Sequence, residues 1–198
     1  MGRSEEEIMR LSCLVLLSFV LAACSPAAPP ADSSFFASLS QLCGQAFEGR
    51  VVSDDPRDAD WAEQRLVMHV RECSAGQIRI PLHVGEDRSR TWVITREAAG
   101  LQLKHDHRHE DGSEDVLSQY GGSTIVPPTE RRAEFPADQF SRMLFDREGI
   151  AVSMANVWSM TLTETSFTYG LDRPDRHFAA EFDLTNPVDA PPPPWGAE

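Results

Sequence analysis

Three histidines stand at alternate positions in the segment LQLKHDHRHED, namely His105, His107 and His109. If this segment is a β-strand, alternate side chains point to the same face of the sheet. The two leucines at positions 101 and 103 share that face and mark it as inward. We therefore expect the histidines to lead from the core of a sheet towards one of its ends.

Two histidines separated by one residue on a strand can both reach one metal ion. Imidazole suits zinc, copper, nickel and iron, and the carboxylates of Glu110 and Asp111 follow directly in the sequence. The pattern predicts a transition-metal site, for example for zinc, formed by His105, His107, His109, Glu110 and Asp111. The alternative interpretation is structural: histidines near the end of a strand hydrogen-bond to neighbouring carboxylates, and DHRHEDGSED is a solvated loop.

A second set of alternating residues contains Arg88, Arg90, Trp92 and Arg96. Arginine recognises carboxylates and phosphates through paired N–H donors, and an indole ring can stack on a ligand. Arg90, Trp92 and Arg96 are therefore predicted ligand-binding residues. In an acidic chain, pairing of these arginines with nearby Asp and Glu residues is the alternative.

Hydrophobic residues recur with a period of two along most of the chain, which is typical of strands. Two helices interrupt this pattern, a short one within 35–47 that ends near Gly44 and a second one within 135–148. Pro81 lies inside the strand predicted at 77–84 and favours an edge or a bulge there. The other strands are predicted at 47–52, 65–73, 90–97, 100–108, 122–128, 151–163, 165–171 and 176–184.

These elements predict a mainly β fold of eight to ten antiparallel strands with an N-terminal helix and one inserted helix. Strands of this length in sequential order suit an up-and-down barrel or a two-sheet sandwich. The helix followed by the sequence FEGRV resembles the entry into lipocalin-type, or calycin, barrels. That resemblance concerns the topology alone.

The N-terminal part has the features of an export signal. Residues 11–23, LSCLVLLSFVLAA, are apolar and uncharged, and they are too few to span a bilayer. The run ends in LAAC, which resembles the lipobox of bacterial lipoproteins and implies a signal peptide over 1–23 and a lipid on Cys24. Three glutamates precede the apolar run, so translation from Met9 rather than Met1 fits a signal peptide better.

The residues that follow resemble a lipoprotein of the cell envelope. By the sorting rule of enteric bacteria, Ser25 after the lipid site favours the outer membrane, with the domain facing the periplasm. We expect a lipidated flexible tether over 24–34, one β-rich domain over 35–186 and a Pro-rich tail over 187–198. As a whole, the chain resembles uncharacterised lipoproteins of Gram-negative bacteria, a group without an assigned activity.

Two cysteines, Cys43 and Cys73, remain once the signal and the lipid site are set aside. An even pair in an oxidising compartment predicts a disulfide. It would close a loop of about 30 residues and contribute roughly 3 kcal/mol. Two buried free thiols are the alternative.

The chain of 198 residues has a net charge of −13, which argues against nucleic acid and anionic membrane surfaces as partners. Membrane attachment is therefore expected through the lipid alone. Three functions stay open: a non-catalytic domain that binds a small ligand or a metal, a metal-dependent enzyme that uses the His-x-His cluster, and a structural or interaction protein of the envelope. For the last of these, the tail that ends near Trp195 is the predicted partner-binding segment.

Overall fold

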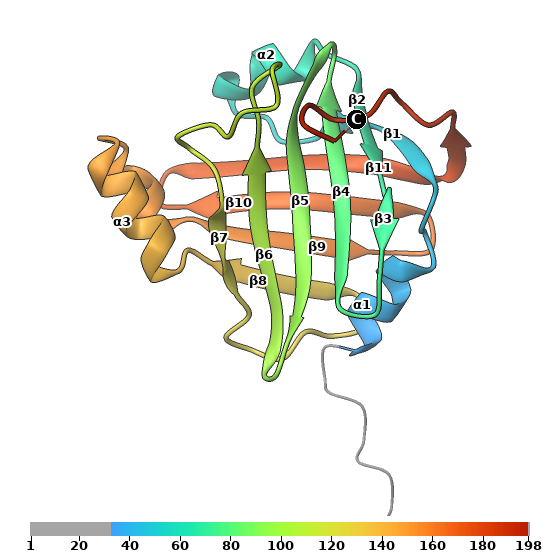
Figure 1. The fold of residues 1–198 in the computed structure, drawn as a ribbon, viewed down its shortest axis with the longest axis horizontal. Coiled ribbons are helices and arrows are strands. Elements are labelled where there is room, and N and C mark those ends of the chain that lie inside the picture. Colours follow the sequence, from blue (N-terminus) through green and yellow to red (C-terminus); the bar gives the residue numbers. More distant parts are fainter. Residues whose placement is uncertain (1–32, 198) are drawn as a thin grey trace, which may run out of the picture.

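Antiparallel strands make up most of the computed structural model, which describes residues 33–197 (Figure 1). The helical segments are α1 (Ser33–Ser40), η1 (Pro56–Asp58), α2 (Ala59–Ala62), α3 (Gln139–Arg147) and η2 (Ala151–Ala155), where η marks a 3-10 helix. The strands are β1 (Ala46–Val51), β2 (Leu66–His69), β3 (Glu72–Cys73), β4 (Gln77–Val84), β5 (Asp87–Glu97), β6 (Gly100–His107), β7 (Tyr120–Ser123), β8 (Arg132–Pro136), β9 (Val157–Leu162), β10 (Ser166–Arg173) and β11 (Arg176–Val188).

The strands of the described region form one sheet in the order β7-β6-β5-β4-β2-β1-β11-β10-β9-β8, with β3 also paired to β4. The two ends of this sheet approach each other, because the backbone N–H of Asp138 donates to the carbonyl of Gly121 at 2.9 Å. At Gly122, an added Cβ atom would lie 1.8 Å from the carbonyl oxygen of Pro136. The sheet is therefore a nearly closed antiparallel barrel, which confirms the predicted fold class and is compatible with the lipocalin-like resemblance.

The two halves of the barrel cross each other. In Figure 1, β4, β5 and β6 run vertically in front of β9, β10 and β11, which run horizontally. Inward-facing side chains of both halves fill the space between them with large apolar groups, as in orthogonally packed sheets. The largest fully buried side chains include Trp92, Trp158, Phe47, Phe135, Phe167 and Phe182.

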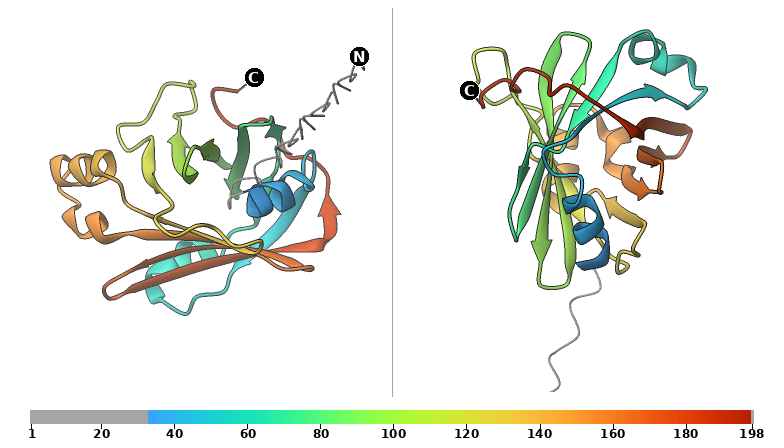
Figure 2. Two further views of the ribbon diagram at one scale, coloured as in Figure 1. Left: turned by 90° about the horizontal axis from the view of Figure 1, so that it is seen from below. Right: turned by 90° about the vertical axis from the view of Figure 1, so that its right-hand side faces the viewer.

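Helix α1 covers one end of the barrel. Its Phe35 and Leu39 are fully buried in the core, and the guanidinium of Arg96 lies 4.1 Å from the ring centroid of Phe36. Because Arg96 is at the end of β5, this contact places α1 at the end where β5 turns into β6. Figure 2 shows the helix at that end of the strands from two further sides.

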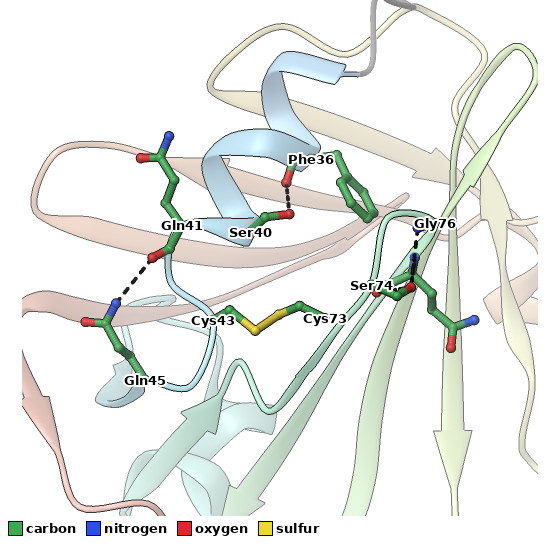
Figure 3. Close-up of a disulfide and its surroundings, with 9 residues drawn as sticks. Phe36, Ser40, Gln41, Cys43, Gln45, Cys73, Ser74 and Gly76 are labelled. Carbon is green, nitrogen blue, oxygen red and sulfur yellow. Dashed lines mark hydrogen bonds between the residues drawn. A yellow bond between two sulfur atoms is a disulfide. The ribbon is translucent and has the colours of Figure 1, made fainter.

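The predicted disulfide between Cys43 and Cys73 is present, with an S–S distance of 2.03 Å (Figure 3). Cys43 lies in the turn after α1, and Cys73 lies in β3. The bond therefore ties the segment that leads into β1 to the strand pair β3–β4. Gly44 follows with a φ of 84°, a left-handed conformation that favours glycine and ends the helical segment where it is predicted to end.

Of the two alternatives predicted from Pro81, the edge is wrong, since β4 pairs with β5 on one side and with β2 and β3 on the other. The bulge is supported, because the register of β4 with β5 shifts between Leu82 and Val84. Within β4, Pro81 lies between the residues that pair with β2 and the residues that pair with β3. At this position, the N–H that proline lacks is not needed for a hydrogen bond to either strand. Strand β8 was not predicted, and residues 56–62, for which no helix or strand was predicted, form η1 and α2.

The C-terminal segment packs against the outer face of the barrel. Strand β11 extends to Val188, inside the range predicted as a tail. Beyond it, the backbone N–H of Trp195 donates to the carbonyl of Arg88 at 3.1 Å, and Arg71 donates to the carbonyl of Ala197 at 3.0 Å. The Trp195 side chain is half-buried. Figure 1 shows the segment passing in front of β2 and β4.

The export segment over 1–23, the lipid site at Cys24 and most of the tether over 24–34 lie outside the described residues. Within residues 33–197, no helix combines the length and the apolar character needed to cross a membrane.

Candidate functional site

A cavity of about 480 Å³ opens at the end of the barrel opposite α1, and we call it the mouth cavity. Residues from almost every element around this end contribute to its wall. The lining residues are Arg57, Asp58, Trp61, Arg90, His107, Asp115, Leu117, Tyr120, Phe145, Ile150, Ser153, Asn156, Trp158, Tyr169, Leu171, Arg176 and Phe178. The volume is in the range of pockets that hold small organic ligands.

Aromatic rings dominate the wall of the mouth cavity. The ring centroid of Tyr120 lies 5.6 Å from that of Trp158 and 5.3 Å from that of Phe145. On the opposite side, Trp61 meets Phe178 edge to face at 5.4 Å. Such rings offer faces and edges to another planar group at little conformational cost.

Two arginines at the rim are bound by local carboxylates. Arg176 donates to both carboxylate oxygens of Asp58, and Arg57 donates to both oxygens of Asp55. The Arg57 guanidinium holds the pKa of the Asp55 carboxyl well below its usual range. These pairs hold η1 and α2 next to the start of β11. Each of the two guanidinium groups is already bound to a carboxylate of its own chain.

Arg90 differs from these two arginines. One of its Nη atoms donates to Asp87 and to Ser89 Oγ at 3.1 Å. Its guanidinium carbon lies 5.1 Å from the ring centroid of Trp61, as in a cation–π contact. No described residue hydrogen-bonds to its other nitrogens, and the side chain is part of the wall of the mouth cavity.

His105 lies deeper in the barrel and is 3% exposed. Its Nδ1 is 3.1 Å from the carbonyl oxygen of Tyr120, and its Nε2 is 2.8 Å from the hydroxyl of Tyr169. Because a carbonyl only accepts, Nδ1 carries the proton and Nε2 accepts from Tyr169. Burial lowers the pKa of His105 to about 3, so the ring is neutral at physiological pH.

His107 lines the mouth cavity one step nearer the rim. Its Nε2 lies 3.3 Å from the hydroxyl of Tyr120, and no described residue contacts its Nδ1. Burial, followed by the charge of Arg90, lowers its pKa to about 4. Burial also raises the pKa of Tyr120 to about 12, so that its hydroxyl stays protonated and can donate to Nε2. In that tautomer, Nδ1–H is a donor towards the cavity.

The residues predicted as a metal site do not meet at one point. The rings of His105 and His107 are 6.4 Å apart, centroid to centroid. His109 lies outside the mouth with its Nδ1 3.9 Å from Asp115, Glu110 is exposed, and Asp111 accepts from the backbone and hydroxyl of Ser113. Within residues 33–197, no three His, Cys, Asp or Glu side chains gather as metal ligands would. Zinc binding therefore stays a prediction without geometric support.

The predicted ligand-binding row on β5 is spread along the barrel. Arg90 lies at the mouth, whereas Trp92 is 2% exposed and stacks on Tyr169 in the core at 4.4 Å between ring centroids. Arg96 is at the opposite end, against α1. Only Arg90 of the three lines the mouth cavity.

Sequence reasoning did not identify most of the cavity wall. No element was predicted around Trp61, and Trp158 and Tyr169 lie in the strands predicted at 151–163 and 165–171. Their alternation within β9 and β10 indicates an inward face but carries no signal for where the core stops and the cavity begins. That boundary depends on how α2, α3 and η2 cover the end of the barrel.

A larger hollow of about 710 Å³ lies on the outer surface over β1, β10 and β11. Its lining is polar and acidic and includes Glu48, Glu181 and Asp183. The Asp183 carboxylate already accepts from Thr185 and Asn186. This hollow has no apolar wall for an organic ligand, and we regard the mouth cavity as the candidate site.

No family model matches the chain, and no curated protein or solved structure shows significant similarity to it.

Proposed function

We propose that this protein is a non-catalytic binding domain that holds a small, largely aromatic or apolar molecule in the mouth cavity. The observation that carries the proposal is the cavity itself, which has an aromatic wall and a few polar groups at the open end of the barrel. A pocket of this composition excludes water from apolar surface and fixes orientation through a small number of polar contacts. Removing apolar ligand area from water supplies the driving force.

The packing around the cavity favours a binding site that exists before the ligand arrives. Tyr120 is held from below by His105, with ring centroids 4.5 Å apart, and from the side by Trp158. Tyr169 is held by Trp92 and by its hydrogen bond to His105. A preorganised wall loses little conformational entropy on binding.

The structure gives less support to the other two functions that the sequence left open, a metal-dependent enzyme and an interaction protein. A metal-dependent enzyme would need the lone pair of His105 Nε2, which accepts from Tyr169. An envelope interaction protein that binds partners through its tail would need the segment around Trp195, which packs on the barrel of its own chain. No observation favours either function over ligand binding.

A fluorescence titration with N-phenyl-1-naphthylamine, an uncharged probe that brightens in apolar surroundings, tests the proposal. We expect saturable binding of one probe per protein. Leu171→Trp adds bulk to the cavity wall and is expected to remove most of the signal. Leu117→Trp fills the same cavity from the loop before β7 and guards against a folding defect in the first variant. Val126→Trp, on an exposed loop outside the cavity, is the matched control. Equal binding by all of these variants would contradict the proposal.

We further propose that the protein is exported and anchored by a lipid on Cys24, most simply at the outer membrane facing the periplasm. The Cys43–Cys73 disulfide supports export, because disulfides persist in oxidising compartments. Metabolic labelling with an alkyne fatty acid tests the anchor. Label is expected on the wild type and absent from Cys24→Ser, and label retained by that variant would exclude this lipid site.

A further inference from the structure

Two residues of the mouth cavity that keep donors without a described partner are located next to each other. Arg90 on β5 and His107 on β6 are direct partners in the strand register. The next pair down the same two strands is Trp92 with His105, which lies in the core. The cavity thus has a polar corner at its rim, formed by neighbouring residues of one hairpin, with aromatic residues deeper inside.

We propose, on the basis of the proposed function, that the ligand is a planar aromatic molecule carrying a carboxylate, with its ring among Tyr120, Trp158 and Tyr169 and its carboxylate against Arg90 and His107. Unpartnered nitrogens of Arg90 and the Nδ1 of His107 are the groups that would receive it. A carboxylate accepts hydrogen bonds only, so it matches a corner that presents donors. Guanidinium provides the charge-assisted bond, and the neutral imidazole provides a second donor.

The two carboxylates of the cavity wall, Asp58 and Asp115, each interact with neighbouring groups of the protein. Asp58 is neutralised by Arg176 and accepts from Ser53. Asp115 accepts from the backbone N–H of Leu117 at 2.7 Å and faces His109 at 3.9 Å.

Asp87 is the one carboxylate that already contacts Arg90, and it does so through a single Nη atom. It fixes the guanidinium while leaving an edge of that group for a ligand. A bidentate pair of the kind seen for Arg176 with Asp58 would instead have used two nitrogens of the guanidinium.

Isothermal titration of the full-length protein with two matched ligands tests the inference. The ligands are 2-naphthoate and 2-naphthamide, which share the ring and differ in charge. We expect the wild type to bind 2-naphthoate about tenfold more tightly than 2-naphthamide, as for one charge-assisted hydrogen bond. Arg90→Gln is expected to abolish this preference, so that the two ligands bind with equal affinity.

Two further variants sharpen the result. Arg88→Gln removes the same charge two residues away, from a side chain that contacts Pro193 of the tail, and is expected to keep the preference. His107→Phe keeps a ring but removes the donor, and is expected to reduce the preference by about fivefold, as for loss of one neutral hydrogen bond.

Each outcome is decisive. If the wild type binds both ligands equally, or if Arg90→Gln keeps the preference, the inference about the carboxylate is wrong and aromatic binding stands. If neither ligand binds, the proposed function fails together with the inference.

Discussion

His105 and His107 share one face of β6, yet their ring nitrogens have different surroundings. Both nitrogens of His105 are used within the core, whereas Nδ1 of His107 faces the mouth cavity. The deeper histidine therefore acts as a support for Tyr120 and Tyr169. The outer one is available to a ligand.

The lowered pKa values of His105 and His107 predict a loss of stability in mild acid. A histidine in an unfolded chain titrates near 6.5, whereas the pKa of His105 is about 3 and that of His107 about 4. At a pH between 6.5 and the pKa in the folded protein, each of these histidines is protonated in the unfolded chain but not in the folded one. The free energy of unfolding is therefore independent of these residues above about pH 7 and falls as the pH decreases from 6.5 towards 4, by about 1.4 kcal/mol per pH unit for each histidine.

Urea unfolding of the wild type and of His107→Gln at pH 7 and pH 4.5 measures this effect. The variant should show the smaller fall, because one group of depressed pKa has been removed. His109→Gln, whose side chain is 58% exposed, should behave like the wild type. The same fall in all three proteins would argue against buried neutral histidines.

Residue identity and spacing predicted part of this site. The alternation LQLKHDH correctly placed the two histidines on the inward face of a strand, and the strands predicted at 90–97 and 100–108 are present as β5 and β6. Their hydrogen-bond partners could not be predicted. Tyr169 is 64 positions away along the chain, and its register opposite His105 depends on closure of the barrel.

Among the elements, the approach of β7 to β8 decides whether the barrel closes. Gly122→Ala would place a methyl group 1.8 Å from the carbonyl oxygen of Pro136. The backbone must move apart, and we expect a loss of about 3 kcal/mol in thermal or urea unfolding, at the upper end of overpacking effects. Gly76→Ala is the matched control, since nothing lies within 4 Å of its added Cβ. Similar stability of the two variants would mean that the two strands are not in contact.

The C-terminal segment is a second element whose contribution can be measured. The indole of Trp195 is half-buried in the segment that packs on the barrel, so Trp195→Ala is expected to destabilise the domain by about 2 kcal/mol, less than the loss for a fully buried ring. Binding of the aromatic probe should persist at temperatures where the variant is folded, because the segment does not line the mouth cavity. A variant as stable as the wild type would show that the tail is not docked in solution.

The Cys43–Cys73 disulfide constrains the unfolded chain more than any other feature of the described region. It encloses a sequence separation of 30 residues, which predicts a contribution of about 3–4 kcal/mol by loop-closure entropy. The double variant Cys43→Ser, Cys73→Ser should lose this amount in urea unfolding and keep probe binding, since neither residue lines the mouth cavity. A stability equal to that of the wild type under oxidising conditions would contradict this contribution.

At the scale of the whole molecule, the barrel has one end covered by α1 and one end open. Periodicity was sufficient to predict a mainly β fold, because most strands alternate apolar and polar residues. It did not predict the short strand β8 or the helical turn of η1 and α2, whose residues are fixed by contacts with distant parts of the chain. The mouth cavity exists because these late and short elements form its rim without filling it.

The four tryptophans of the chain provide the most direct test of this account. Trp61 and Trp158 line the mouth cavity, while Trp195 lies half-buried in the C-terminal segment, outside that cavity. Indole N–H signals in a ¹H–¹⁵N correlation spectrum, assigned by single Trp→Phe variants, report on each place separately during titration with 2-naphthamide. The account predicts saturable shifts of the Trp61 and Trp158 signals with the Trp195 signal unchanged. Shifts confined to Trp195, or no shifts at saturating ligand, would contradict a ligand site inside the barrel.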